Sequence, residues 1–132
     1  MSQENVEAVR GAFQVLAAEG MDAALAFFAP DCVWYTSDRF PDAPAFHGHD
    51  GMRRLRGSFT EVFDNWRFEV DDIRDAPDRV VALIHMVGEL KGSASSVNQP
   101  MGLVVDFRSG KIGDVRAFAT WAEALEAAGL SE

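Results

Sequence analysis

The sequence has one cysteine, no long apolar run and no excess of basic residues, and each absence excludes a class of protein. Cys32 has no second thiol to pair with, so no internal disulfide can form and we expect a reducing compartment. No apolar run, Val80 to Ile84 included, approaches the ~20 residues of a membrane-spanning helix. A net charge of −9 argues against nucleic acid or an anionic membrane as a partner, because phosphate binding needs clustered Lys and Arg.

Motifs for targeting, metals and cofactors are also lacking. The first ten residues show no basic stretch before an apolar core, so there is no sign of a secretory signal and we expect a cytoplasmic protein. There is no glycine-rich phosphate loop and no Ser-His-Asp pattern, and we expect no cofactor. His47 and His49 could chelate a metal, but no third ligand is evident, so we expect none.

What is present is enough for one domain over residues 1–132. Apolar residues at helical spacing, including Val9, Phe13 and Leu16, predict amphipathic helices. Thr120 and Glu123 form a capping box that predicts a closing helix. The predicted helices cover residues 4–19, 22–28, 50–64 and 121–128.

Two long β-compatible runs within residues 97–119 flank a turn at Ser109-Gly110, which predicts a hairpin. Earlier strands are expected over residues 32–37, 66–75 and 79–91, and the alternation slips near Asp71-Asp72, which indicates a bulge. Tight turns between successive strands predict an α+β fold with the helices on one face of the sheet. The expected shape is a curved mixed or antiparallel sheet wrapped around the N-terminal helices, a cone-shaped α+β barrel with an internal pocket.

Short motifs along the chain support this order of elements. They are Glu4 to Arg10, Met21 to Leu25, Pro30-Asp31 before Val33-Trp34, His47 to Gly51, Asp78 to Val81, Ser109 to Ile112 and Glu123 to Leu130. Their order and spacing resemble the SnoaL-like branch of the nuclear transport factor 2-like superfamily, also known for its ketosteroid isomerase-like cone fold. The resemblance implies a hydrophobic pocket between the concave face of the sheet and the helices. It also implies a homodimer through the convex face, for which we expect Asp106, Arg116 and Phe118.

The same resemblance predicts which side chains face the pocket. They are Phe13, Trp34, Thr36, Leu55, Leu83, His85, Val87, Gln99, Met101, Leu103, Val115, Ala117 and Ala119. The general base of ketosteroid isomerase-like relatives falls on Thr36, and their oxyanion-hole residues fall on Phe13 and Leu103. An acid of epoxide hydrolase-like relatives falls on Ala117. None of these positions carries the required group, so both chemistries are disfavoured.

Three functions stay open. The first is a binding protein for a small hydrophobic molecule in an apolar pocket. The second is an isomerase or polyketide-cyclase-like enzyme, with His85 and Glu89, four residues apart on one strand, as acid and base. The third is a non-catalytic dimerisation or accessory module whose pocket is filled by its own side chains.

Overall fold

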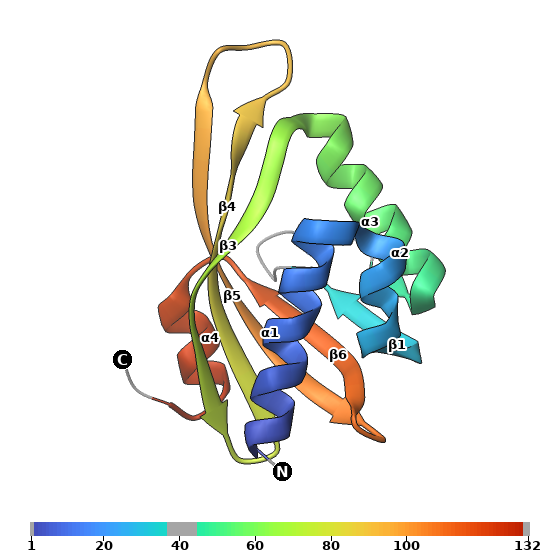
Figure 1. Cartoon of the computed structure of the whole chain (residues 1–132). Coiled ribbons are helices and arrows are strands. Elements are labelled where there is room, and N and C mark those ends of the chain that lie inside the picture. The colour runs from blue at the N-terminus through green and yellow to red at the C-terminus, as the bar shows by residue number, and fades with distance from the viewer. Residues whose placement is uncertain (1, 37–44, 131–132) are drawn as a thin grey trace.

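A curved sheet with helices on both faces forms the protein (Figure 1). The computed structural model describes residues 2–36 and 45–130. In chain order the elements are α1 (Ser2–Glu19), α2 (Met21–Ala24), a 3-10 turn (Leu25–Phe27), β1 (Phe28–Tyr35), β2 (Phe46–His47), α3 (Gly48–Val62), β3 (Phe63–Ala76), β4 (Arg79–Leu90), β5 (Ser96–Arg108), β6 (Lys111–Phe118) and α4 (Trp121–Ala127). The predicted strand over residues 32–37 begins four residues earlier in the structure, and its last residue lies outside the described part.

The six strands form one mixed sheet in the order β2-β1-β6-β5-β4-β3. β1 runs parallel to β6, and every other neighbouring pair is antiparallel. At the predicted hairpin, Ser109 and Gly110 have φ of 52° and 80°, so both turn residues adopt the left-handed conformation that suits a tight hairpin. The β4–β5 hairpin extends beyond the body of the molecule at the top of Figure 1.

β3 is an edge strand with two irregularities. Its pairing with β4 shifts between Asp64 and Arg67, and again between Val70 and Asp72. The second shift makes Asp71 a bulge residue and confirms the bulge predicted there. A four-residue segment, 67–70, therefore lies between two interruptions of the ladder, where local opening of an edge strand costs least.

Two apolar clusters lie on opposite faces of the sheet. The larger one fills the concave face beneath α1, the 3-10 turn and α3, and it includes Val80, Ala82 and Ile84 of β4. The smaller one contains Val81 and Leu83 of β4 together with residues of α4. Successive side chains of a strand point to opposite faces, so α4 lies on the convex face, as Figure 1 also shows. The prediction that all helices lie on one face was wrong for α4.

Thr120 caps the start of α4 as predicted, and its side chain pairs with Glu123. The Thr120 side chain accepts a hydrogen bond from the Glu123 backbone N–H (3.2 Å) and donates one to the Glu123 carboxylate (2.9 Å). Trp121 adds a hydrogen bond from Nε1 to the Ile84 carbonyl oxygen (3.0 Å), which ties α4 to β4. Among the described residues, no helix is long and apolar enough to cross a membrane.

Candidate functional site

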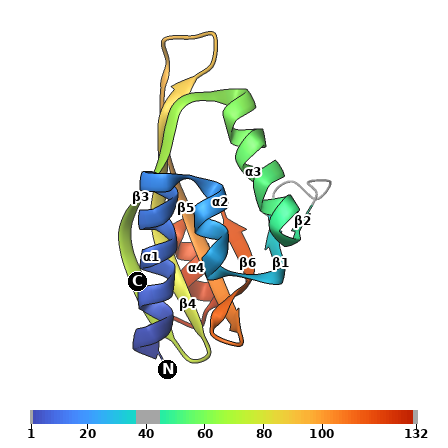
Figure 2. The same ribbon diagram turned by 45° about the vertical axis from the view of Figure 1, so that its right-hand side comes forward.

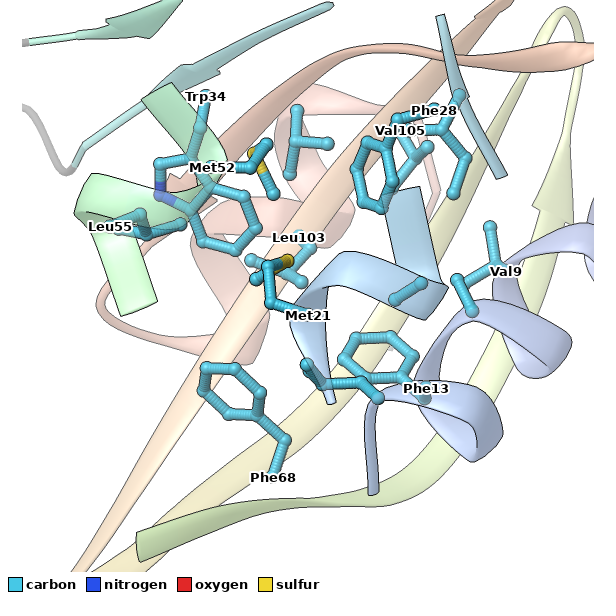
Figure 3. A pocket seen from close by; sticks show the side chains of 15 residues that line it. Val9, Phe13, Met21, Phe28, Trp34, Met52, Leu55, Phe68, Leu103 and Val105 are labelled. Atoms are coloured by element: carbon cyan, nitrogen blue, oxygen red, sulfur yellow. The ribbon is translucent and has the colours of Figure 1, made fainter. Parts of the chain in front are cut away.

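The concave face of the sheet encloses a small apolar cavity (Figure 3). Its volume is about 50 Å³. The lining side chains come from all the helices of the concave face and from four strands: Val9, Ala12, Phe13, Leu16, Met21, Ala24, Phe28, Trp34, Met52, Leu55, Phe68, Leu103, Val105, Ile112 and Val115. Of these described residues none is titratable, so the wall offers no acid or base to a molecule inside.

Two methionines make part of this wall adaptable. Met21 of α2 and Met52 of α3 are both buried, and Figure 3 shows Met52 near Trp34 and Met21 near Leu103. Unbranched thioether side chains can repack around molecules of different shapes. The cavity is therefore small in this conformation but lined by side chains that can adjust.

At one end the cavity is closed by Phe13 of α1 and Phe68 of β3, whose rings meet edge to face with centroids 6.1 Å apart. Phe68 also meets Phe59 (5.5 Å) and Trp66 (5.4 Å) edge to face, and Phe59 stacks on Trp66 at 5.0 Å. We call Phe13, Phe59, Trp66 and Phe68 the aromatic gate. It joins α1, α3 and β3, which Figure 2 shows as separate ribbons, with β3 and α1 at the left and α3 at the right.

An outer depression of about 260 Å³ lies on the other side of this gate. Phe13, Leu16 and Phe68 line both the inner cavity and the outer depression. Its remaining lining residues are Ala17, Arg56, Trp66 and Arg67. The two spaces are thus separated by a thin partition of side chains rather than by backbone.

Five of the predicted pocket residues line the cavity: Phe13, Trp34, Leu55, Leu103 and Val115. Met101 and Ala117 belong to the same apolar cluster without lining the cavity. Gln99 lies exposed near the start of β5, and Ala119 lies in the bend after β6. Thr36 lies just beyond the end of β1 and is partly buried.

The predicted inward register of β4 was wrong by one residue. Leu83 packs against α4 on the convex face. His85 and Val87 share that face of the strand, because they follow Leu83 at intervals of two, and the His85 ring lies 5.1 Å from the Trp121 ring. Residues Val80 to Met86 are apolar on both faces apart from His85, so their pattern could not show which face is concave.

The predicted acid–base pair is not brought together at the cavity. His85 Nδ1 lies 2.7 Å from a carboxylate oxygen of Asp71, the bulge residue, outside the cone. Glu89 is exposed and accepts a hydrogen bond from Asn65 (3.0 Å). Four residues of extended strand separate the two side chains by roughly 13 Å, too far for both to act on one small reacting group.

The sequence interpretation missed several lining residues, above all Phe68, Met21 and Met52. Phe68 was assigned to a strand with alternating polarity, and that alternation was the signal for its inward side chain. The two methionines lie at positions where helix packing, rather than strand register, decides what faces the cavity.

The remaining histidines, His47 and His49, lie at the start of α3. His49 Nε2 donates a hydrogen bond to the Phe28 carbonyl oxygen (3.1 Å), which fixes the start of α3 against β1, whereas His47 is exposed. Within residues 2–36 and 45–130 no group of three or more His, Cys, Asp or Glu side chains could hold a metal ion.

All three residues predicted for a dimer face have partners within the chain. The Asp106 carboxylate accepts the Asp114 backbone N–H (2.6 Å), and the Arg116 guanidinium lies 5.9 Å from the centroid of the Phe118 ring. Phe118 packs beside α4, so its ring contributes to the smaller apolar cluster. Asp106 and Arg116 also line a depression of about 140 Å³ together with Arg79 and Asp114, so both signs of charge meet there.

Comparison with known proteins agrees with the fold. A protein from Burkholderia thailandensis described as NTF2-like has 22% sequence identity and a TM-score of 0.77, over 92% of this chain and 96% of its own. A candidate SnoaL-like polyketide cyclase from Jannaschia sp. CCS1 has 18% identity and a TM-score of 0.76, over 96% and 92%. TerC, co-crystallised with polyporic acid, has 16% identity and a TM-score of 0.77, over 95% and 97%.

None of the curated proteins matches the sequence significantly. The SnoaL-like domain model matches residues 9–115, which include every cavity-lining residue described above. The chain belongs to the SnoaL-like domain family and has the NTF2-like, ketosteroid isomerase-like fold.

Proposed function

We propose that the protein binds a small apolar molecule in the cone, behind the aromatic gate. The observation that carries this proposal is a cavity whose described wall is formed by apolar side chains and which a few side chains divide from an outer depression. A polar molecule would lose its hydrogen bonds to water inside such a wall, whereas an apolar one gains from leaving water.

The size of the cavity defines what binding requires. Ligand pockets usually have roughly 300 Å³ or more, and the inner cavity has about 50 Å³. A ligand therefore needs Phe13 and Phe68 to turn, which joins the inner cavity to the 260 Å³ depression. The ring contacts that are lost, each worth about 0.5–1.5 kcal/mol, can be replaced by contacts with the ligand.

Binding is favoured over catalysis because the described cavity wall holds no titratable side chain. His85, the residue best suited to acid–base chemistry on the sequence, lies on the other face of the sheet. TerC, of the same fold, was co-crystallised with a small molecule, which supports a ligand-binding role for this architecture.

A filling variant tests the proposal with the neutral dye N-phenyl-1-naphthylamine, whose fluorescence rises in apolar sites. Ala12→Val adds two methyl groups to the cavity wall, and we expect dye affinity to fall by about tenfold because the cavity has no spare volume. Ala18→Val is the matched control. Ala18 is exposed on the same helix, so the substitution lowers helix propensity by the same amount, and this variant should bind the dye as wild type does.

Phe68→Ala provides the opposite perturbation. Removing this ring opens the partition, so we expect faster association of the dye and a higher affinity. The proposal fails if the wild-type protein does not bind the dye, or if Ala12→Val and Ala18→Val bind it equally.

A further inference from the structure

We infer that the ligand of the cone is a small aromatic or alicyclic carboxylate, whose ring enters past the aromatic gate and whose carboxylate pairs with Arg56 at the mouth. This inference rests on the proposed function, because it needs a molecule in the cone. The inference concerns the polar end of the ligand, whereas the apolar cavity indicates only its apolar end.

The charge of the outer depression carries the argument. The chain has 21 acidic and 12 basic residues, yet among the described residues the only charged side chains that line this depression are Arg56 and Arg67. An acidic protein in general repels anions. A depression whose described charged side chains are both cations is therefore a local reversal of charge next to the apolar cavity.

Arg67 is largely neutralised by its own strand. Its Nε and Nη2 both donate to one carboxylate oxygen of Glu69, at 3.1 and 2.7 Å. Arg56 makes no side-chain hydrogen bond or ion pair with the described residues, in contrast to Arg53 of the same helix, which bonds Asp22 and Asp50 at 2.7 Å each. Arg56 is thus the cation at the mouth whose fork of donors is open to an incoming anion.

The position of Arg56 on α3 connects it to the cavity. Leu55, the residue before it, is buried in the cavity wall, and Phe59, three residues after it, belongs to the aromatic gate. A molecule that extends from the cavity wall to the guanidinium must pass this gate, where Trp66 and Phe68 offer ring faces and edges for stacking. A flat apolar body with one anionic end matches both halves of the site.

A carboxylate is the anion that this mouth recognises best. A guanidinium binds a carboxylate through two parallel N–H···O bonds. A phosphate dianion would need more compensation than a single unpaired arginine supplies, since every other charge at the mouth is already paired. The structure therefore favours a monoanion.

The test compares 4-phenylbutyrate with its uncharged amide, 4-phenylbutanamide, by isothermal titration calorimetry. We expect wild type to bind the carboxylate about fivefold more tightly than the amide, a factor typical of a partly exposed charge pair. Arg56→Gln should abolish that preference and leave the affinity for the amide unchanged. The preference should also shrink as salt is raised from about 0.05 to 0.5 M, because salt screens exposed pairs.

Arg54→Gln is the matched control. Arg54 is exposed on the same helix and does not line the depression, so its loss removes the same charge and should preserve the preference. The inference is overturned if wild type binds both probes equally, or if Arg56→Gln keeps the preference for the carboxylate. In either case the proposed function is still supported if wild type binds the amide and Ala12→Val weakens that binding. If neither probe binds, the proposed function fails as well.

Discussion

Gly102 of β5 allows α4 to pack directly against the convex face, and replacing it with alanine tests this contact. A methyl group at Gly102 would overlap the Ala124 methyl and lie 3.1 Å from the Thr120 carbonyl oxygen. Neither group can rotate away, because one is fixed to the helix backbone and the other is part of the backbone. Overpacking of this kind costs about 1–3 kcal/mol, and we expect Gly102→Ala to lower the free energy of unfolding by about 2 kcal/mol.

The docking of α4 limits how large the loss can be, since the helix can leave the sheet instead of straining it. Leu125 is buried in this contact and is worth roughly 1.5–3 kcal/mol. The Trp121 hydrogen bond to Ile84 adds about 1 kcal/mol. Detachment would also expose Val81 and Leu83 of β4, so it costs more than the roughly 4 kcal/mol of these two contacts, and the loss expected from Gly102→Ala lies below this limit.

Urea unfolding followed by circular dichroism measures the effect, and a loss of 2 kcal/mol should lower the melting temperature by roughly 8 °C. Gly57→Ala is the control: Gly57 lies within α3 with no heavy atom within 4 Å of an added Cβ, so alanine should raise stability by roughly 1 kcal/mol. The same substitution thus has opposite signs at the two sites.

A second variant distinguishes the steric contact from a general intolerance of β5. In Gly102→Ala combined with Ala124→Gly, the overlapping methyl group is removed from the helix. We expect the double variant to be more stable than the sum of the two single changes predicts, by more than about 0.5 kcal/mol. Additive effects, or Gly102→Ala within about 0.5 kcal/mol of wild type, would refute the steric argument.

Three further outcomes are expected. Burial raises the pKa of the Cys32 thiol, so native protein should react with iodoacetamide at pH 8 far more slowly than urea-unfolded protein, and equal alkylation rates would contradict the buried position. The unfolded chain releases the thiol proton at lower pH than the folded protein, so stability falls as the pH is raised, and Cys32→Ala should lessen this fall. Trp121→Phe should cost about 1 kcal/mol in urea unfolding, because the Ile84 carbonyl loses its donor; unchanged stability would show that water replaces the indole. We propose a homodimer through the convex face around Asp106 and Arg116. Sedimentation velocity at micromolar concentration should show a dimer for wild type and a monomer for Arg116→Glu, and a monomeric wild type would contradict the proposal.

The helices and strands followed from local signals in the sequence. The Thr120–Glu123 capping box set the start of α4, and the slip in alternation at Asp71-Asp72 located the bulge. These signals depend only on neighbouring residues, so the sequence contains them completely.

The faces of the sheet depend on distant residues and were harder to predict. β5 and β6 were assigned correctly, since Leu103 and Val115 line the cavity. β4 was assigned to the wrong register, because α4 covers its second face and makes Val81 and Leu83 as apolar as Val80 and Ala82. The two possible registers of β4 differ in which face α4 covers, and only the position of α4 distinguishes them. Gly102 is the residue that allows α4 to pack there.

The mouth of the cone could not be predicted from residue spacing. In the sequence, Arg56 is one of three arginines close together, a pattern typical of a solvated helix face, and this describes Arg53 and Arg54 well. What sets Arg56 apart is the approach of Trp66 and Phe68 from β3, a strand that begins after α3 ends. Contacts between elements that meet only in the fold leave no periodic signal in the chain.

The burial of β4 on both faces has a consequence for how the cone can change shape. Residues 80–84 lie in a strand that is paired on both sides and packed between two apolar clusters. Hydrogen exchange of their amides should therefore be the slowest in the molecule and should report global unfolding. The segment 67–70 on the edge strand should exchange through small local openings. The part of the cone formed by β4 is then rigid, while the part formed by β3 fluctuates. Substitutions in β3 would alter how fast molecules enter the cavity, whereas substitutions in β4 would alter whether the protein folds.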